Sequence, residues 1–159
     1  MGISIALAQY LAEHDVPYDV VEHAHSGTAS QSAGASHIPP DRIAKAVVLK
    51  AGHGFILAVL PASRHIQFAE LRKQLGEDVD LANEEQIETL FLDCELGAVS
   101  ALGAAYGLKV IVDSSLANQP EIYLEGGDHA SLVHISGATF RALTAGASQA
   151  SFCGLRLRT

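Results

Sequence analysis

Two apolar runs joined by a short glycine-rich turn constrain the fold of this chain more than any other feature. The runs IAKAVVLK at residues 43–50 and FILAVL at residues 55–60 flank the turn AGHG. Aliphatic runs of this length are typical of β-strands, and a glycine-containing connection of a few residues is typical of a hairpin. Parts of both runs are apolar on both faces, which is typical of strands that are covered on both sides. The sequence therefore predicts a central hairpin with other elements packed on each face of its sheet.

Helices and further strands surround this hairpin in an irregular order. Apolar residues at helical spacing and capping residues predict helices or helical turns at 4–14, 28–37, 40–43, 68–75, 83–91 and 136–145. Short apolar runs predict strands at 17–22, 79–81, 108–113, 120–124 and 131–135. Because helices and strands do not alternate regularly, we expect an α+β or mixed α/β fold and not a doubly wound sheet. Residues 1–146 are expected to form a single domain, followed by a C-terminal tail at 147–159.

The composition excludes several classes of protein. No apolar run approaches the roughly 20 residues that span a membrane, and the first residues lack the basic region of a secretory signal. Two cysteines, Cys94 and Cys153, make neither a disulfide framework nor a metal site of four cysteines, so the cytoplasm is the expected location. Nucleotide-binding motifs and metal-ligand spacings are also missing from the sequence. We therefore expect no cofactor and no metal.

The formal net charge of −8 limits contact with nucleic acid. A protein that coats nucleic acid neutralises many phosphates with lysine and arginine, whereas no lysine or arginine of this chain precedes Arg42. Any contact with a nucleic acid is therefore expected to be local, at the basic residues between Arg42 and Lys109. Binding to DNA is not expected.

One lysine, Lys45, stands at the head of the first apolar run between Ala44 and Ala46. An ammonium group that loses hydration in an apolar setting must meet an anion, a carbonyl group or a bound water. The small neighbouring side chains leave room for a ligand at this place. The alternative is a lysine that extends its charge to solvent, as Lys50 at the other end of the run is expected to do.

Three segments, in this order, resemble the YbaK and prolyl-tRNA-synthetase-associated editing family, whose members hydrolyse amino acids wrongly attached to tRNA. They are the run at 43–50, the loop GAVSA at 97–101 and the segment EGGDH at 125–129. The likeness extends over roughly residues 16–145. It implies the fold of that family, a mixed and mostly antiparallel, partly barrel-like central sheet surrounded by helices.

The resemblance also implies roles for individual residues. Lys45 matches the lysine on which the family depends, and Gly97 begins its Gly-x-x-x-Pro loop, so both are predicted to be catalytic. The loop here ends at Ala101 in place of proline, which removes a fixed φ angle and puts amino-acid selectivity in question. The residues predicted to bind the substrate are Thr28, Ser32, Ser100, Ala101, Asp113 and His129. Among them, His129 is expected to orient the α-amino group of the substrate.

The predicted activity is that of a trans-acting aminoacyl-tRNA deacylase. It would remove a small amino acid such as alanine or cysteine from tRNA, with tRNAPro as the expected tRNA, by attack of water without a covalent enzyme intermediate. The expected partners are the acceptor end of a mischarged tRNA and an aminoacyl-tRNA synthetase, with no membrane. Two alternatives stay open: a non-catalytic ligand-binding or regulatory domain that keeps the editing fold, and a hydrolase of small free esters or amides.

Overall fold

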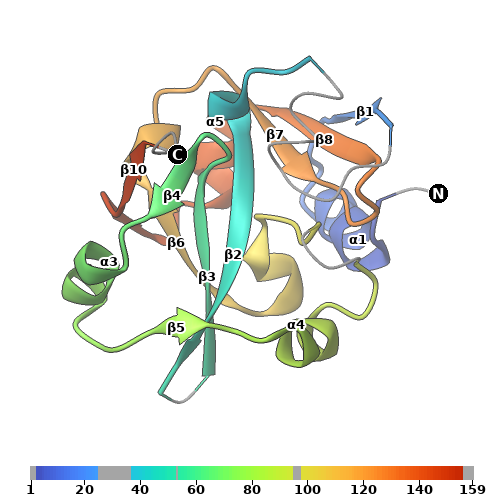
Figure 1. Ribbon diagram of the computed structural model, residues 1–159. Coiled ribbons are helices and arrows are strands. Elements are labelled where there is room, and N and C mark those ends of the chain that lie inside the picture. Colours follow the sequence, from blue (N-terminus) through green and yellow to red (C-terminus); the bar gives the residue numbers. More distant parts are fainter. Residues whose placement is uncertain (1–2, 25–36, 53, 95–97, 156–159) are drawn as a thin grey trace.

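A central sheet organises the fold in the computed structural model, which describes residues 3–24, 37–52, 54–94 and 98–155 (Figure 1). Its strands follow the order β1-β8-β7-β2-β3-β6-β9, with β5 beside β2, and a second sheet pairs β10 with β4. The strands are β1 (Asp19–Glu22), β2 (Ile43–Ala51), β3 (Gly54–Pro61), β4 (Arg64–Ile66), β5 (Asp80–Leu81), β6 (Lys109–Asp113), β7 (Glu121–Glu125), β8 (Ser131–Ser136), β9 (Ser148–Ala150) and β10 (Cys153–Leu155). Parallel and antiparallel pairs both occur, which confirms the mixed α/β class.

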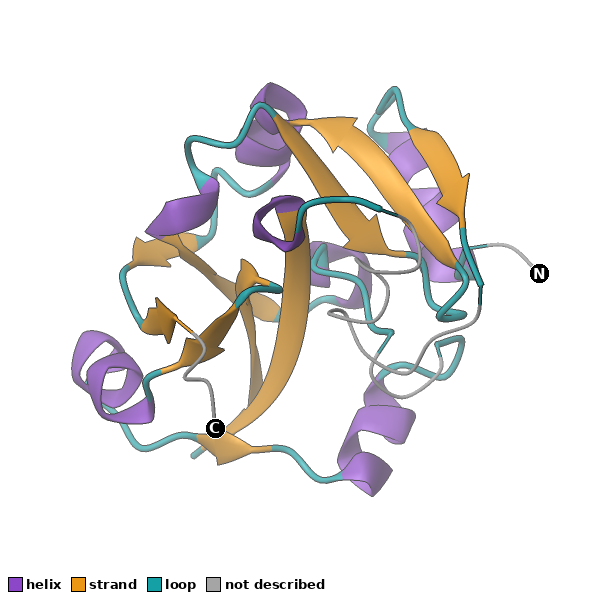
Figure 2. Ribbon diagram, turned by 45° about the horizontal axis from the view of Figure 1, so that its top comes forward, coloured by secondary structure: helices purple, strands orange, loops and turns teal. Residues whose placement is uncertain are grey.

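Helices lie around the strands (Figure 2). The α-helices of the described ranges are α1 (Ile5–Glu13), α3 (Phe68–Leu75), α4 (Glu84–Leu90) and α5 (Gly137–Leu143). Short 3₁₀ helices are η1 (Pro40–Arg42), η2 (Gly103–Tyr106) and η3 (Ser114–Leu116). None of the helices in these ranges has the length and apolar character needed to cross a membrane.

The predicted hairpin is the centre of the sheet. β2 and β3 pair antiparallel from Ala44 opposite Pro61 to Ala51 opposite Gly54. β3 is buried along nearly its whole length, from Ile56 onward. Hydrophobic clusters lie against both faces of the hairpin, so its residues are covered as the apolar pattern predicts.

The two faces of β2 serve different cores. Alternate residues, among them Ala44 and Val48, join the larger core, which is closed by α1, α4 and α5. The residues between them point to the opposite face. On that face Leu49 belongs to a second cluster, next to α3, and Ile43 to a third, smaller cluster. Lys45 follows Ile43 by two positions and therefore rises from this second face.

Side-chain caps define the ends of several helices, as the sequence predicts. The Ser4 hydroxyl accepts a hydrogen bond from Leu7 N at the start of α1, and Ser136 does the same for Thr139 N in α5. Asn83 and Gln86 form a reciprocal capping box at α4. Gly76 ends α3 in the left-handed conformation, with φ of 70°.

The C-terminal segment differs from the expected tail at 147–159. Residues 148–150 form β9, which lies parallel to β6, and residues 153–155 form β10, which pairs with β4. Between them Phe152 is fully buried in the second cluster. The small residues in and around these strands give no alternating apolar pattern, so the sequence does not predict the strands. The helix predicted at 28–37 falls almost entirely outside the described residues.

Gly137 provides a test of how closely the chain packs. A Cβ atom at Gly137 would lie 1.9 Å from the carbonyl oxygen of Gln119, far inside van der Waals contact. The hydrogen bond of 2.8 Å from Gly137 N to Pro120 O holds the two segments together. We expect Gly137→Ala to lower the free energy of unfolding by about 1–3 kcal/mol, because the backbone must move to accept the methyl group. Urea denaturation measures this difference.

Gly146→Ala is the matched control, since a Cβ atom there meets nothing within 4 Å. Its free energy of unfolding should stay within about 0.5 kcal/mol of the wild type. Equal stability of the two variants would contradict the packing around Gly137.

Candidate functional site

One edge of β2 changes its partner where Lys45 lies. Ile43 and Ala44 pair in parallel with Tyr123 and Leu124 of β7. Further along the same edge, β2 pairs with β5 at residues 49–50. In the described part of the chain, no strand pairs with this edge at residues 45–47. Lys45 is therefore the first residue past the end of the β7 pairing, at a break in the sheet.

A buried carboxylate is the next residue of β7 after this pairing. Continuing the β2–β7 register by one residue places Lys45 next to Glu125, and register neighbours project on the same face of a sheet. Glu125 is only 1% exposed, whereas Lys45 is partly buried. Glu125 is not among the site residues predicted from the sequence. Its signal there is a carboxylate that ends an apolar strand directly before two glycines.

Asp113 lies in the same row across the sheet, two strands beyond Lys45. Leu60 pairs with Lys45, and continuing the β3–β6 register places Asp113 next to Leu60. The Asp113 carboxylate accepts hydrogen bonds from Phe152 N at 2.9 Å and from the Ser115 backbone and hydroxyl. Burial works to raise the pKa of Asp113, but these hydrogen bonds outweigh it and leave the pKa lowered. The carboxylate thus anchors the C-terminal segment, and its predicted contact with substrate stays a prediction.

His129 occupies an unusual backbone conformation in the loop that follows Glu125. Its φ angle is 57° and it is 3% exposed. Asp128 stabilises this turn by accepting hydrogen bonds from Ala130 N at 2.9 Å and from the Ser131 hydroxyl at 3.2 Å. The left-handed conformation costs about 1–2 kcal/mol in a residue other than glycine. A buried histidine held in such a conformation is a candidate for a functional role.

The loop of His129 packs against the segment that leads to Gly97. Gly127 has φ of 118°, and a Cβ atom there would lie 3.4 Å from the sulfur of Cys94 and 3.5 Å from Asp93 O. Gly97 itself lies outside the described residues, as do Thr28 and Ser32. The structure therefore brings Asp93 and Cys94 next to the loop of His129.

The end of the 97–101 loop turns into the larger core. Ser100 is buried, and its hydroxyl accepts a hydrogen bond from Leu102 N at 3.2 Å. Ala101 is fully buried and packs in the larger core. It also lines a pocket of about 260 Å³ with η2, β6 and the end of α5. This pocket adjoins the larger core, on the face of the sheet opposite the one from which Lys45 rises. The predicted contacts of Ser100 and Ala101 with substrate stay predictions.

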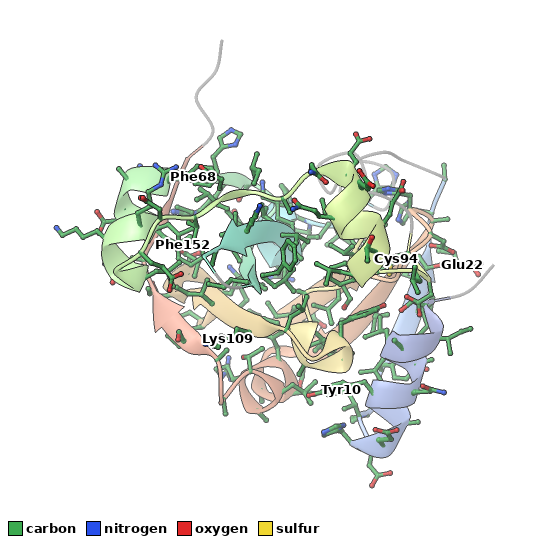
Figure 3. The ribbon with its side chains drawn as sticks, turned by 90° about the horizontal axis from the view of Figure 1, so that it is seen from below. Tyr10, Glu22, Phe68, Cys94, Lys109 and Phe152 are labelled. Atoms are coloured by element: carbon green, nitrogen blue, oxygen red, sulfur yellow. The ribbon has the colours of Figure 1, made fainter. Side chains whose placement is uncertain are left out.

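A hydrogen-bond network fixes the base of these loops to α1. The Tyr106 hydroxyl donates to Asp93 at 2.9 Å and lies 2.8 Å from the Ser4 hydroxyl and 3.2 Å from the sulfur of Cys94. Asp93 also accepts a hydrogen bond from Ala6 N at 2.9 Å. Figure 3 shows Cys94 beside α1, with Phe68 and Phe152 on the other side of the molecule.

The network shifts the pKa of each of its ionisable members. Burial works to raise the pKa of Asp93, but the hydrogen bonds from Ala6, Tyr106 and Cys94 lower it overall. Burial, followed by the hydrogen bond with Cys94, raises the pKa of Tyr106 strongly, and burial raises the pKa of Cys94. Cys94 is therefore a thiol and Asp93 a carboxylate at neutral pH.

His134 belongs to a polar cluster at the far end of the same face. It lies 3.5 Å from Asp19 and 3.1 Å from Glu121, and its ring stacks on Tyr123 with centroids 4.6 Å apart. Arg42 approaches Glu121 to 3.4 Å. The described residues hold no group of three histidine, cysteine or acidic side chains arranged to bind a metal ion.

Comparison with known proteins identifies similar sequences. A model of the aminoacyl-tRNA editing domain matches residues 23–143 of this chain. A proline–tRNA ligase of Bacillus cytotoxicus is 27% identical over 82 residues, which are 51% of this chain and 14% of the ligase. The chain therefore matches only a small part of the length of that ligase.

Solved structures share the fold. A protein described as a candidate trans-editing enzyme for prolyl-tRNA synthetase superposes with a TM-score of 0.80 at 23% identity, covering 94% of this chain and 95% of the other. A hypothetical protein superposes with a TM-score of 0.82 at 17% identity, covering 94% and 99%. At these identities the likeness concerns the fold alone.

The network around Tyr106 makes a prediction about stability and pH. Tyr106→Phe removes a hydrogen bond to an ionised carboxylate and should lower the free energy of unfolding by about 1–3 kcal/mol at pH 7. Because the pKa of Asp93 is lowered by folding, its contribution is complete above the unfolded value near 3.8 and disappears as the pH falls through the folded value. The difference between wild type and variant should therefore shrink below about pH 4. Denaturation curves from pH 7 to pH 2.5 measure it.

Tyr18→Phe serves as the control, because Tyr18 is 40% exposed. Its effect should stay below about 0.5 kcal/mol at every pH. A Tyr106→Phe effect that does not change with pH would count against the bond to ionised Asp93.

Proposed function

The chain belongs to the aminoacyl-tRNA editing domain family, and from this we propose that it is a trans-acting deacylase that removes a small, wrongly attached amino acid from tRNA. The family resemblance found in three sequence motifs is confirmed by the match over residues 23–143. The observation that supports the proposal is that Lys45 is partly buried and stands directly after the last pair of β2 with β7.

Hydrolysis of an aminoacyl ester requires little covalent chemistry from the protein. Water adds to the ester carbonyl carbon, the bond to the ribose oxygen breaks, and the proton from water passes to that oxygen. Negative charge develops on the carbonyl oxygen on the way. The ammonium group of Lys45 would stabilise this charge or hold the terminal phosphate and ribose, and backbone groups at Gly97 would position the water. No covalent intermediate is required.

The other groups of the site would recognise the amino acid. His129 would orient the α-amino group from its fixed loop, with Asp113, Thr28 and Ser32 completing the surroundings. A pocket gains only about 1–3 kcal/mol for each methylene that it admits, so a separate site that accepts small residues has a clear use. Alanine and cysteine are the proposed substrates. The name of the ligase relative supports tRNAPro as the tRNA and prolyl-tRNA synthetase as the partner.

A second candidate is a non-catalytic binding domain of the same fold. The net charge of −8 and alanine at position 101 in place of proline favour it. Turnover of mischarged tRNA separates the two candidates.

Lys45→Ala tests the proposed role of the lysine. We expect the rate of deacylation of mischarged tRNA to fall about 100-fold or more, since stabilisation of the developing charge is lost. Melting temperatures of wild type and variant accompany the rates, so that a loss of folding is told apart from a loss of catalysis. The assay compares alanyl-, cysteinyl- and seryl-tRNAs, including those on tRNAPro.

Lys50→Ala is the matched control, because Lys50 lies on the same strand but is exposed at its end. It should keep nearly the wild-type rate. A folded wild-type protein that hydrolyses no member of the panel would support the binding-domain candidate instead.

Substitutions at Ala101 test whether the 97–101 loop selects the amino acid that is removed. Ala101→Pro restores a fixed φ angle, and we expect it to raise the preference for one amino acid over the others, whereas Ala101→Gly should lower that preference. The ratio of alanyl- to cysteinyl-tRNA turnover measures the effect. Because Ala101 is fully buried, melting temperatures accompany each rate. Unchanged ratios in two folded variants would exclude this loop as the selector.

A further inference from the structure

Lys45 and Glu125 each follow directly after the last pair of β2 with β7, although 80 positions separate them in the chain. The parallel register Ile43–Tyr123 and Ala44–Leu124 continues to these two residues, and neighbouring strands lie about 4.8 Å apart. Burial confirms the face on which they project. Ile43, Tyr123 and Leu132 share a small cluster, and Leu132 is the antiparallel partner of Glu125.

The setting of Glu125 is unusual for an acidic residue. Its side chain is 1% exposed, and glutamates are almost never this buried unless an opposite charge or hydrogen-bond donors compensate. Lys45 is the adjacent cation in the register of the strands, and it has the length to bring its ammonium group over the carboxylate. Neither group would be stable in this place without such compensation.

We propose that Glu125 is the positioning residue for Lys45, its carboxylate holding the ammonium group charged and in a fixed orientation at the break in the sheet. This inference rests on the proposed deacylase function. In that function, a lysine side chain that is neutral or has no fixed orientation would stabilise little of the charge that develops on the ester carbonyl oxygen. Glu125 acts through Lys45 and does not itself touch the substrate.

The hairpin of β7 and β8 would then position both ends of the substrate. Glu125 is the last residue of β7, and the loop that follows it carries His129 in its constrained conformation. Ser4 N donates a hydrogen bond of 2.7 Å to Gly126 O, so α1 fixes the loop directly after the carboxylate. The loop that carries His129 is thus tied to the start of α1 directly after the carboxylate that we propose to hold Lys45.

Other ionisable groups on this face are placed differently. Asp113 lies two strands away with its carboxylate bonded to Phe152 N and Ser115, and Asp128 is bonded to Ala130 N and Ser131. Glu121 and His134 lie together at the opposite end of β7. Tyr123 stacks on His134, and His129 lies in the adjoining loop. Glu125 is thus the carboxylate nearest to Lys45 in the register of the strands.

A titration of Lys45 tests the inference without reference to activity. The lysines of the chain are Lys45, Lys50, Lys73 and Lys109, so reductive methylation with ¹³C-formaldehyde gives few lysine resonances, and Lys45→Arg assigns the one that matters. In Glu125→Gln, which keeps the shape of the side chain, the titration midpoint of Lys45 should fall by about one pH unit or more. Glu125→Asp, which keeps the charge, should leave the midpoint near the wild-type value. An unchanged midpoint in Glu125→Gln would overturn the proposal.

The matched control is Glu121→Gln, on the same strand and face but beside Arg42 and His134. It should leave the Lys45 midpoint unchanged. A shift as large as that of Glu125→Gln would show a general field effect and would overturn the specific pairing.

Deacylation kinetics test the positioning role itself. Glu125→Gln should slow single-turnover hydrolysis about 10- to 100-fold, with Glu125→Asp intermediate between it and the wild type. The double variant Lys45→Ala/Glu125→Gln should be no slower than Lys45→Ala, because Glu125 acts only through the lysine. Independent, multiplying losses would overturn the inference. A wild type that hydrolyses no mischarged tRNA would overturn the proposed function, whereas the titration would still decide the coupling of the two side chains.

Discussion

The change of partner along one edge of β2 is the constraint on which the site depends. β2 keeps β3 along its whole length, but on its other edge it pairs first with β7 and then with β5. Between these two pairings, residues 45–47 have no neighbouring strand on this edge in the described part of the chain. The first of them stands directly after the β7 pairing. Lys45 occupies that position, with Glu125 ending the neighbouring strand. The arrangement of the strands therefore puts two charged side chains in a sheet whose other central residues are apolar.

The loops around this place are held from outside the sheet. The first turn of α1 supplies Ser4 and Ala6, which bond Gly126 and Asp93, and Tyr106 joins the same network from η2. Three segments far apart in the sequence thus meet at one helix end. This arrangement lets the loops keep small residues, which a substrate needs for close approach, without losing their order.

The sequence predicts the parts of this arrangement that depend on local patterns. The hairpin at 43–60, the caps Ser4, Asn83 and Ser136, and the end of α3 at Gly76 all follow from short-range signals. Register between distant strands has no such signal, so the position of Glu125 next to Lys45 in the continued β2–β7 register follows only from the three-dimensional structure. The same reason explains β9 and β10, whose short segments gain their stability from β6, β4 and the buried Phe152.

The charge of the molecule limits how a tRNA can bind. Arg42 and Arg72 each lie within 3.4 Å of a carboxylate, which weakens what they offer to a phosphate. With a net charge of −8, the chain has little to gain from counterion release along an RNA helix. A substrate of this site would therefore be held mainly at its aminoacylated end, by the ester, the α-amino group and the terminal nucleotide. Selection among tRNAs would then require a second protein, and the proposed partnership with a synthetase would supply it.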